Sequence, residues 1–452
     1  MLTLIVAALL TTSAQASPHA PENGAGDALI KRLEADPQDL DVLEELAELG
    51  RYADAPWWKM TYTDKIAANP RASAARRAEA VRQAGEMRLQ LGDFHGAQMD
   101  FERALEAAPG DGGLLYLLAL AKQERPEEAL IDAERAAKAA GFSAAGRANA
   151  NLLAGQLRTD IGNAAAAQAS LTLALSDAPD DLDALYAMVR VLRERKSEAL
   201  VFARRADDAA GRTPLWQRPA ALLLSARIWL ELEEHAPAAE KLLAVLRFNP
   251  EDLDALGALV RIKDKLTAKQ LDDARRASLL AAAPDARVPE ASNDEDALKR
   301  ALADNPDDLE TLRRLAVSSL QRRRRIEAAV FALRFEDAVW KTPVWQRAEA
   351  NRVLAALWLD LGSRDRAWAI LNRARDLKSD SIDTWRMFIA LRPSERGTNL
   401  KGVYSGIYCT AAEMRMAIGD RAGATESVNL SLKQEPGHPW SLRLRAALKN
   451  RP

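Results

Sequence analysis

The stretch GEMRLQLGDFHGAQMDFERALEAAP at residues 85–109 returns as GQLRTDIGNAAAAQASLTLALSDAP at residues 155–179. The same positions in both copies hold two glycines, two alanines, one large apolar residue and a proline. In the first copy they are Gly85, Gly92, Ala97, Phe101, Ala104 and Pro109. Ala97, Phe101 and Ala104 have the spacing of one helix face. Gly92 suits a left-handed turn between two helices, and Pro109 suits a helix end. The pattern predicts a helical hairpin in which Gly85 lets the second helix approach closely.

The same grid of small residues recurs, less completely, at residues 219–252, 348–380 and 405–438. Four further segments open with a proline, followed by an acidic first turn and leucines at helical spacing. They are PQDLDVLEELAEL (37–49), PDDLDALYAMVRVL (179–192), PEDLDALGALVRI (250–262) and PDDLETLRRLAVSSL (306–320). Acidic residues near a helix N-terminus meet the positive end of its dipole, so each segment is predicted to be the first helix of a hairpin.

This unit of about 34 residues resembles the tetratricopeptide repeat. The resemblance covers residues 27–450 and implies an all-α fold, a right-handed α-solenoid of about ten antiparallel helical hairpins. We expect a signal peptide at 1–16, a flexible linker at 17–26, an N-terminal solenoid at 27–283, a loop at 284–294 and a C-terminal solenoid at 295–452.

A longer repeat lies over the hairpins. SEALVFARRADDAAGRTPLWQR (197–218) aligns without a gap to IEAAVFALRFEDAVWKTPVWQR (326–347), 129 positions later. We interpret the alignment as duplication of a block of several hairpins. Thr213–Pro214 and Thr342–Pro343 are predicted to be an N-cap followed by proline at the first helical position. Trp216 and Trp345 follow two residues after each proline.

The first residues, MLTLIVAALLTTSAQA, fit a signal peptide cleaved after Ala16, although no Lys or Arg precedes the apolar run. The alternative is an apolar N-terminus that is not a signal, in a cytoplasmic adaptor. One cysteine, Cys409, excludes an intramolecular disulfide. A secreted chain without disulfides favours the bacterial periplasm. The formal net charge of −2 gives no reason to expect nucleic acid as a partner.

No catalytic motif is recognisable, and no cofactor or metal site is expected. The four histidines are far apart in sequence, and the paired carboxylates occur at helix starts, where capping explains them. We therefore predict a protein that is not an enzyme. The alternatives are an accessory subunit of an envelope enzyme complex, or an active site in the less regular stretches 51–70 or 391–405.

The resemblance implies that the first helix of each hairpin lines a concave groove that binds a peptide or protein. The partner is expected to act in cell-envelope assembly or export, and the oligomeric state is left open. Residues predicted to face the groove are Arg82, Glu86, Asn149, Gln156, Arg227, Arg352 and Glu413. Some family members clamp a carboxylate with a repeated asparagine. Here the matching positions hold other residues, namely Glu86, Gln156, Arg227, Ala356 and Glu413.

Three other features have two interpretations each. The run Arg322–Arg325 is either a solvated turn or a contact for anionic lipid or an acidic protein. Cys409 is either a buried apolar residue or a groove residue. The tryptophans of the C-terminal half are expected in the core, with an exposed binding anchor as the alternative: Trp340, Trp345, Trp358, Trp368 and Trp385.

Overall fold

The computed structural model describes residues 1–452 except 1–24, 53–55, 282–294, 379–380, 392–397 and 450–452. Every regular element in the described ranges is a helix, which confirms the predicted all-α fold. None of these helices is long and apolar enough to cross a membrane. The predicted signal peptide and the predicted loop at 284–294 lie outside the described residues. Helix α2 begins at Ala25, two residues inside the range expected to be linker.

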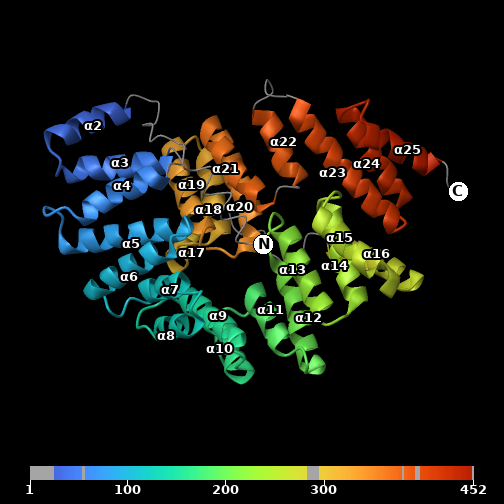
Figure 1. The fold of residues 1–452 in the computed structure, drawn as a ribbon, viewed down its shortest axis with the longest axis horizontal. Coiled ribbons are helices and arrows are strands. Elements are labelled where there is room, and N and C mark those ends of the chain that lie inside the picture. Colours follow the sequence, from blue (N-terminus) through green and yellow to red (C-terminus); the bar gives the residue numbers. More distant parts are fainter. Residues whose placement is uncertain (1–24, 53–55, 282–294, 379–380, 392–397, 450–452) are drawn as a thin grey trace. The chain divides into compact units, whose positions relative to one another are not determined.

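The chain divides into two compact units, Met1–Asn163 (unit 1) and Ala164–Pro452 (unit 2). The predicted division at 284–294 stays a prediction. Figure 1 shows unit 1, from blue to green, as helices that alternate in direction. They are α2 (Ala25–Ala35), α3 (Leu40–Tyr52), α4 (Pro56–Ala67), α5 (Ala74–Gln90), α6 (Phe94–Ala107), α7 (Gly112–Ala121), α8 (Pro126–Ala137) and α9 (Ala144–Asp160).

Unit 2 contains three successive groups of helices. The proximal arm has α10 (Ala164–Asp177), α11 (Leu182–Val191), α12 (Lys196–Arg212), α13 (Arg218–Glu231), α14 (His235–Phe248), α15 (Leu253–Ile262), the short 3₁₀ helix η1 (Lys263–Lys265) and α16 (Ala268–Ala281). The distal arm has α17 (Glu295–Asp304), α18 (Leu309–Gln321), α19 (Arg325–Val339), α20 (Val344–Asp360), α21 (Arg364–Leu377) and α22 (Ile382–Leu391). The C-terminal module has α23 (Thr398–Ala417), α24 (Arg421–Gln434) and α25 (Pro439–Lys449).

The hairpin of α5 and α6 has the predicted geometry. Phe101 and Ala104 are buried on the face of α6 that packs against α5. A Cβ atom added to Gly85 would lie 2.7 Å from a ring carbon of Phe101. The absence of a side chain at residue 85 therefore sets the closeness of the two helices.

The turns between paired helices use the left-handed backbone that the sequence predicts. Gly92 has φ +80° and Gly162 has φ +85°. Asp93 follows the first turn, and its Oδ1 accepts the backbone N–H of Gly96 at 2.9 Å, which caps α6. Glu233 and Arg323 adopt the same region with φ of 58° and 60°, so these two turns carry backbone strain that glycine would avoid.

The four proline-led acidic segments are the starts of α3, α11, α15 and α18, as predicted. The acidic side chains also act as N-caps, a more specific role than interaction with the helix dipole. Asp181 accepts the N–H of Ala184 at 2.8 Å, and Asp252 accepts that of Ala255 at 3.0 Å. Each bond satisfies a backbone donor that a helix start leaves unpaired.

The prediction for the two Thr-Pro pairs is wrong. Helix α13 begins at Arg218, four residues after Pro214, and Pro343 precedes the first residue of α20. The hydroxyl of Thr213 donates to the carbonyl of Ala210 at 2.7 Å, and that of Thr342 donates to Val339 at 2.6 Å. Both threonines therefore satisfy terminal carbonyls of the preceding helix, which are as short of partners as the N–H groups of the next one.

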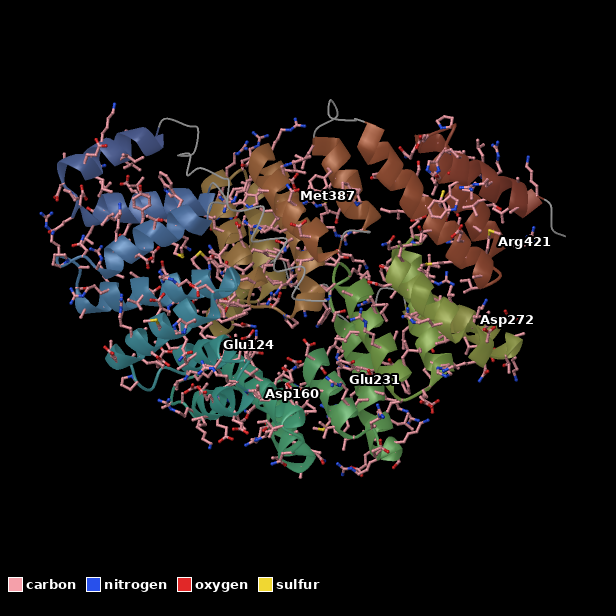
Figure 2. All side chains as sticks on the ribbon, viewed as in Figure 1. Glu124, Asp160, Glu231, Asp272, Met387 and Arg421 are labelled. Carbon is pink, nitrogen blue, oxygen red and sulfur yellow. The ribbon has the colours of Figure 1, made fainter. Side chains whose placement is uncertain are left out.

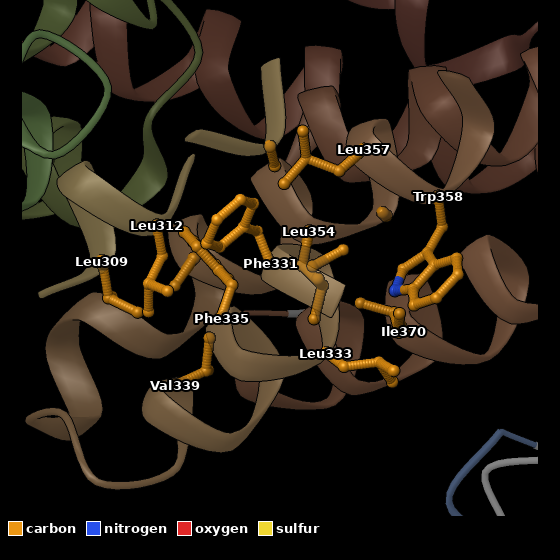
Figure 3. Packing of buried hydrophobic residues seen from close by; sticks show 14 of the residues in the cluster. Leu309, Leu312, Phe331, Leu333, Phe335, Val339, Leu354, Leu357, Trp358 and Ile370 are labelled. Atoms are coloured by element: carbon orange, nitrogen blue, oxygen red, sulfur yellow. The ribbon is translucent and has the colours of Figure 1, made fainter. Parts of the chain in front are cut away.

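The distal arm has its own apolar core. Leu312, Phe335 and Leu354 are fully buried in it, and Trp358 and Ile370 pack at its other end (Figure 3). These residues come from α18 to α21, so the core runs across two hairpins. This continuity is what the repeat resemblance implies, because one hairpin alone leaves an apolar face uncovered.

The C-terminal module packs on the proximal arm, through α23 and α15. Arg88 and Arg158, each four residues before a turn glycine, pair with a carboxylate 24 residues earlier: Asp64 at 2.7 Å and Glu134 at 2.6 Å. Arg415 likewise lies four residues before the turn glycine Gly419. The residue 24 positions before it is Leu391, which has no carboxylate to accept the arginine. Arg415 Nη2 instead donates to the carbonyl of Pro250 at 2.5 Å. Stacking in unit 2 is therefore not confined to neighbours in sequence.

Replacement of Gly85 by Ala is expected to lower the free energy of unfolding by about 2 kcal/mol, because the added methyl group overlaps the ring of Phe101. The measurement is urea denaturation followed by far-UV circular dichroism. Gly110→Ala is the matched control in the same unit, since a Cβ at residue 110 meets nothing within 4 Å. Equal denaturation midpoints for the two variants would contradict the prediction.

Candidate partner-binding surfaces

Two of the predicted groove residues, Arg82 and Glu86, form an ion pair with each other on α5. Arg82 also binds Glu79 at 2.5 Å, and this hydrogen bonding raises the pKa of Arg82 above its usual value. The other two predictions in unit 1 lie on α9, where Asn149 is half-buried and Gln156 is exposed. Binding of a partner by these four residues stays a prediction.

Two of the predicted residues in unit 2 have local partners. Arg352 forms an ion pair with Glu349, one turn earlier on α20, and its Nη1 lies 3.4 Å from Ser381 Oγ. Glu413 is exposed on α23 and accepts the indole N–H of Trp440 at 2.8 Å, which ties α25 to α23. The contacts of Arg352 with Ser381 and of Glu413 with Trp440 each join two segments of the fold.

The seventh residue, Arg227, belongs to a cluster on the first helices α11 and α13. Tyr186 on α11 donates its hydroxyl to Glu231 on α13 at 3.1 Å, and Glu231 is labelled in Figure 2. The Arg190 guanidinium carbon lies 5.9 Å from the centre of the Tyr186 ring. Arg227 lies one turn before Glu231 and close enough to Tyr186 to influence its hydroxyl. We call these four residues the Tyr186 patch.

The Tyr186 patch has an excess of available positive charge. Arg190 and Arg227 are both exposed, and within the described part of the chain neither forms a salt bridge. Burial, followed by the Glu231 carboxylate, raises the pKa of Tyr186, so the phenol stays neutral and can donate a hydrogen bond. Two available guanidinium groups beside a tyrosine form a surface that suits an anionic group.

The duplicated tryptophans connect the two arms of unit 2. Trp345, at the start of α20, donates its indole N–H to Asp183 on α11 at 3.0 Å. Trp216, before α13, donates its own to Glu310 on α18 at 2.8 Å. Asp183 and Glu310 hold matching positions, each two residues after the N-cap aspartate of its helix. Each tryptophan therefore reaches the carboxylate of the other arm, and we call the two contacts the Trp345 clasp and the Trp216 clasp.

The two clasps differ in electrostatics. Arg313 binds both carboxylate oxygens of Glu310, at 2.7 and 2.8 Å. No such cation supports Asp183 in the described structure. Burial and the negative charge of Asp181 raise the pKa of Asp183 to about 6, although the Trp345 hydrogen bond acts in the opposite direction. Trp216 also packs against Phe335, with ring centres 6.3 Å apart. The Trp345 clasp is thus the less supported contact.

The arginine run is mostly used inside the protein. Arg322 and Arg324 bind Glu295, and Arg325 donates to the Leu361 carbonyl. Hydrogen bonds from Arg324 and Lys299 hold the pKa of Glu295 at about 2. These internal pairs favour the interpretation as a turn over that of an anion-binding contact.

Most tryptophans of the C-terminal half contribute to the core, as expected. Trp358 is buried, and Trp368 and Trp385 pack edge-on or tilted against Phe388, at 4.6 and 5.5 Å. Trp345 departs from that group through its clasp. Cys409 is fully buried in the C-terminal module, where its Sγ lies 3.1 Å from Ser441 Oγ. In the described ranges, no group of three or more His, Cys, Asp or Glu is arranged to hold a metal ion.

No family model matches the sequence, and no curated protein matches it. The fold is similar to solved tetratricopeptide-repeat structures. The crystal structure of YrrB, a TPR protein with an unusual peptide-binding site, is 20% identical, with 53% of this chain and 98% of YrrB covered and a TM-score of 0.30. The Cut9–Hcn1 hetero-tetramer of APC/C gives 13% identity, coverage of 93% and 91%, and a TM-score of 0.32. The assignment of tetratricopeptide-like hairpins rests on this chain's own sequence and geometry.

Sequence reasoning did not find Asp183, Tyr186 or Arg190. They lie in PDDLDALYAMVRVL at positions i, i+3 and i+7, which is the spacing of one helix face. That periodicity could have indicated a polar stripe on α11. Its partners on α13 and α20 could not be found in this way, because they are distant in sequence.

Replacement of Asp183 by Asn is expected to stabilise the protein by about 1–2 kcal/mol at pH 7.5 and to have little effect at pH 4. A folded-state pKa of about 6, above the unfolded value, means that ionisation of Asp183 costs stability as the pH rises between about 4 and 6. The asparagine carbonyl still accepts the Trp345 N–H. Urea unfolding of both proteins across this pH range measures the difference, and a pH-independent difference would contradict the prediction.

Proposed function

We propose that this protein is a non-enzymatic scaffold that binds a protein or peptide partner through the Tyr186 patch. One observation carries the proposal: Arg190 and Arg227 lie exposed on adjacent first helices, beside Tyr186, without salt bridges in the described structure. The partner segment is acidic, because its carboxylates would pair with both guanidinium groups.

The location of the patch supports this function. Helices α11 and α13 are the first helices of consecutive hairpins, and the hydrogen bond from Tyr186 to Glu231 joins them. Their apolar residues are buried inside the hairpins, which holds the backbone beneath the patch rigid. A surface on rigid elements presents its charged groups in one geometry and loses little conformational entropy when a partner binds.

Lack of a recognisable catalytic motif favours a binding role over chemistry. In the predicted alternative stretch 51–70, the described residues serve the packing of helices. Asp64 pairs with Arg88 of α5 at 2.7 Å, and the amide of Asn69 donates to the Gln38 carbonyl at 3.1 Å. These contacts account for Asp64 and Asn69 without a substrate.

We further propose that the protein acts in the bacterial periplasm, in envelope assembly or export. The apolar run at residues 2–10 and the sequence Ala14–Gln15–Ala16 support secretion. A secreted chain with one cysteine has no intramolecular disulfide, which favours the bacterial periplasm over a eukaryotic extracellular space.

The double variant Arg190→Glu, Arg227→Glu is expected to lose its partner, because two attractive charges become repulsive. The wild-type and variant chains, each carrying a C-terminal tag, would be crosslinked in cells, captured and compared by quantitative mass spectrometry. We expect at least a tenfold loss of the captured partner. Arg193→Glu is the control, since Arg193 is exposed beyond the end of α11. Equal capture by all three proteins would contradict the proposal.

Mature protein isolated from its native cells is expected to begin at Ser17. Edman sequencing of the purified protein tests this directly, and cell fractionation with a cytoplasmic marker enzyme is the control. An intact Met1 in the cytoplasmic fraction would reject the proposed secretion and support the adaptor alternative.

A further inference from the structure

The Trp345 clasp and the Tyr186 patch share one face of α11. Asp183, Tyr186 and Arg190 follow each other at helical spacing, so the carboxylate that accepts Trp345 lies one turn from the tyrosine of the patch. Helix α20, which carries Trp345, also contacts α13, which carries Arg227. The distal arm therefore lies against both helices that form the patch.

We propose that Trp345 is an internal ligand that covers one end of the Tyr186 patch, and that an acidic partner segment carrying its own tryptophan displaces it. This inference rests on the proposed function and specifies the partner: an indole N–H donor for Asp183, followed by carboxylates for Arg190 and Arg227. The chain's own contact shows that the site accepts an indole in this position.

Comparison of the clasps indicates which one opens. The Trp216 clasp has a bidentate arginine on its acceptor and a ring contact with Phe335 in the distal core. The Trp345 clasp has a carboxylate next to a second carboxylate, Asp181, and no supporting cation in the described structure. Opening therefore occurs at Trp345, while the Trp216 clasp keeps the two arms joined.

The competition gives a function to a half-buried, poorly supported acceptor at a helix start. A surface that presents Asp183 and two arginines without a ligand would bind acidic segments with little selectivity. An internal indole makes binding more selective, because a partner must replace the indole as well as supply negative charge. The apparent affinity is then the intrinsic affinity multiplied by the fraction of molecules in which the clasp is open.

The test uses the full-length chain and two equivalent variants, Trp345→Phe and Trp216→Phe. Phenylalanine keeps an aromatic ring and removes the N–H donor. Hydrogen–deuterium exchange is expected to rise about tenfold at the amides of residues 184–190 in Trp345→Phe and to stay unchanged there in Trp216→Phe. Trp345→Leu breaks the same contact and leaves Asp183 available to a peptide, so it serves if Trp345→Phe does not fold.

The binding probe is a fluorescein-labelled peptide of sequence EEWEE, with EEFEE as its control. We expect EEWEE to bind Trp345→Phe at least about fivefold more tightly than wild type or Trp216→Phe, and EEFEE to gain less. Unchanged exchange at 184–190, or no gain in EEWEE affinity, would overturn the inference. The proposed function is judged separately, by the capture experiment with Arg190→Glu, Arg227→Glu, and it can stand when the clasp inference fails.

Discussion

The close approach of two helices within each hairpin is the constraint on which the rest of the structure depends. Phe101 reaches from α6 to the position on α5 where Gly85 has no side chain, and the left-handed turn at Gly92 brings the helices into that register. Each hairpin still leaves an apolar face uncovered, and only a neighbouring helix can bury it. The way in which neighbouring helices bury these apolar faces also decides which polar faces of the first helices lie side by side.

In unit 2, the helix that buries the apolar face of a hairpin is not always the next one in sequence. The module of α23 to α25 covers α15, with Arg415 bound to the Pro250 carbonyl. The two arms exchange tryptophans through matching carboxylates. The duplication that we infer from the sequence would account for the exchange, since two related blocks carry the same donor and nearly the same acceptor, and a donor of one fits the acceptor of the other.

The sequence predicts the hairpins well because their determinants are local. Small residues at Gly85 and Ala97, turn glycines, and acidic residues at helix starts act within a few turns of chain. Local patterns also led to an error, since Thr213 and Thr342 have the chemistry of an N-cap and yet satisfy the helix behind them. The Tyr186 patch depends on α11 and α13 being side by side, and the clasps join residues 162 and 94 positions apart. Periodicity along one helix cannot specify such contacts.

The difference between the two clasps is the basis of the separate roles that we propose for them. Glu310 is followed one turn later by Arg313, which neutralises it, whereas the matching residue after Asp183 is Tyr186. That one change removes a cation from the clasp and places a phenol on the same helix face, where it meets Glu231 of α13. Tyrosine in place of arginine at this position therefore leaves the Trp345 clasp without a cation and also supplies the central residue of the Tyr186 patch. A contact that only joined the arms would gain from an arginine in both places, so the tyrosine fits the binding role that we propose for the Tyr186 patch.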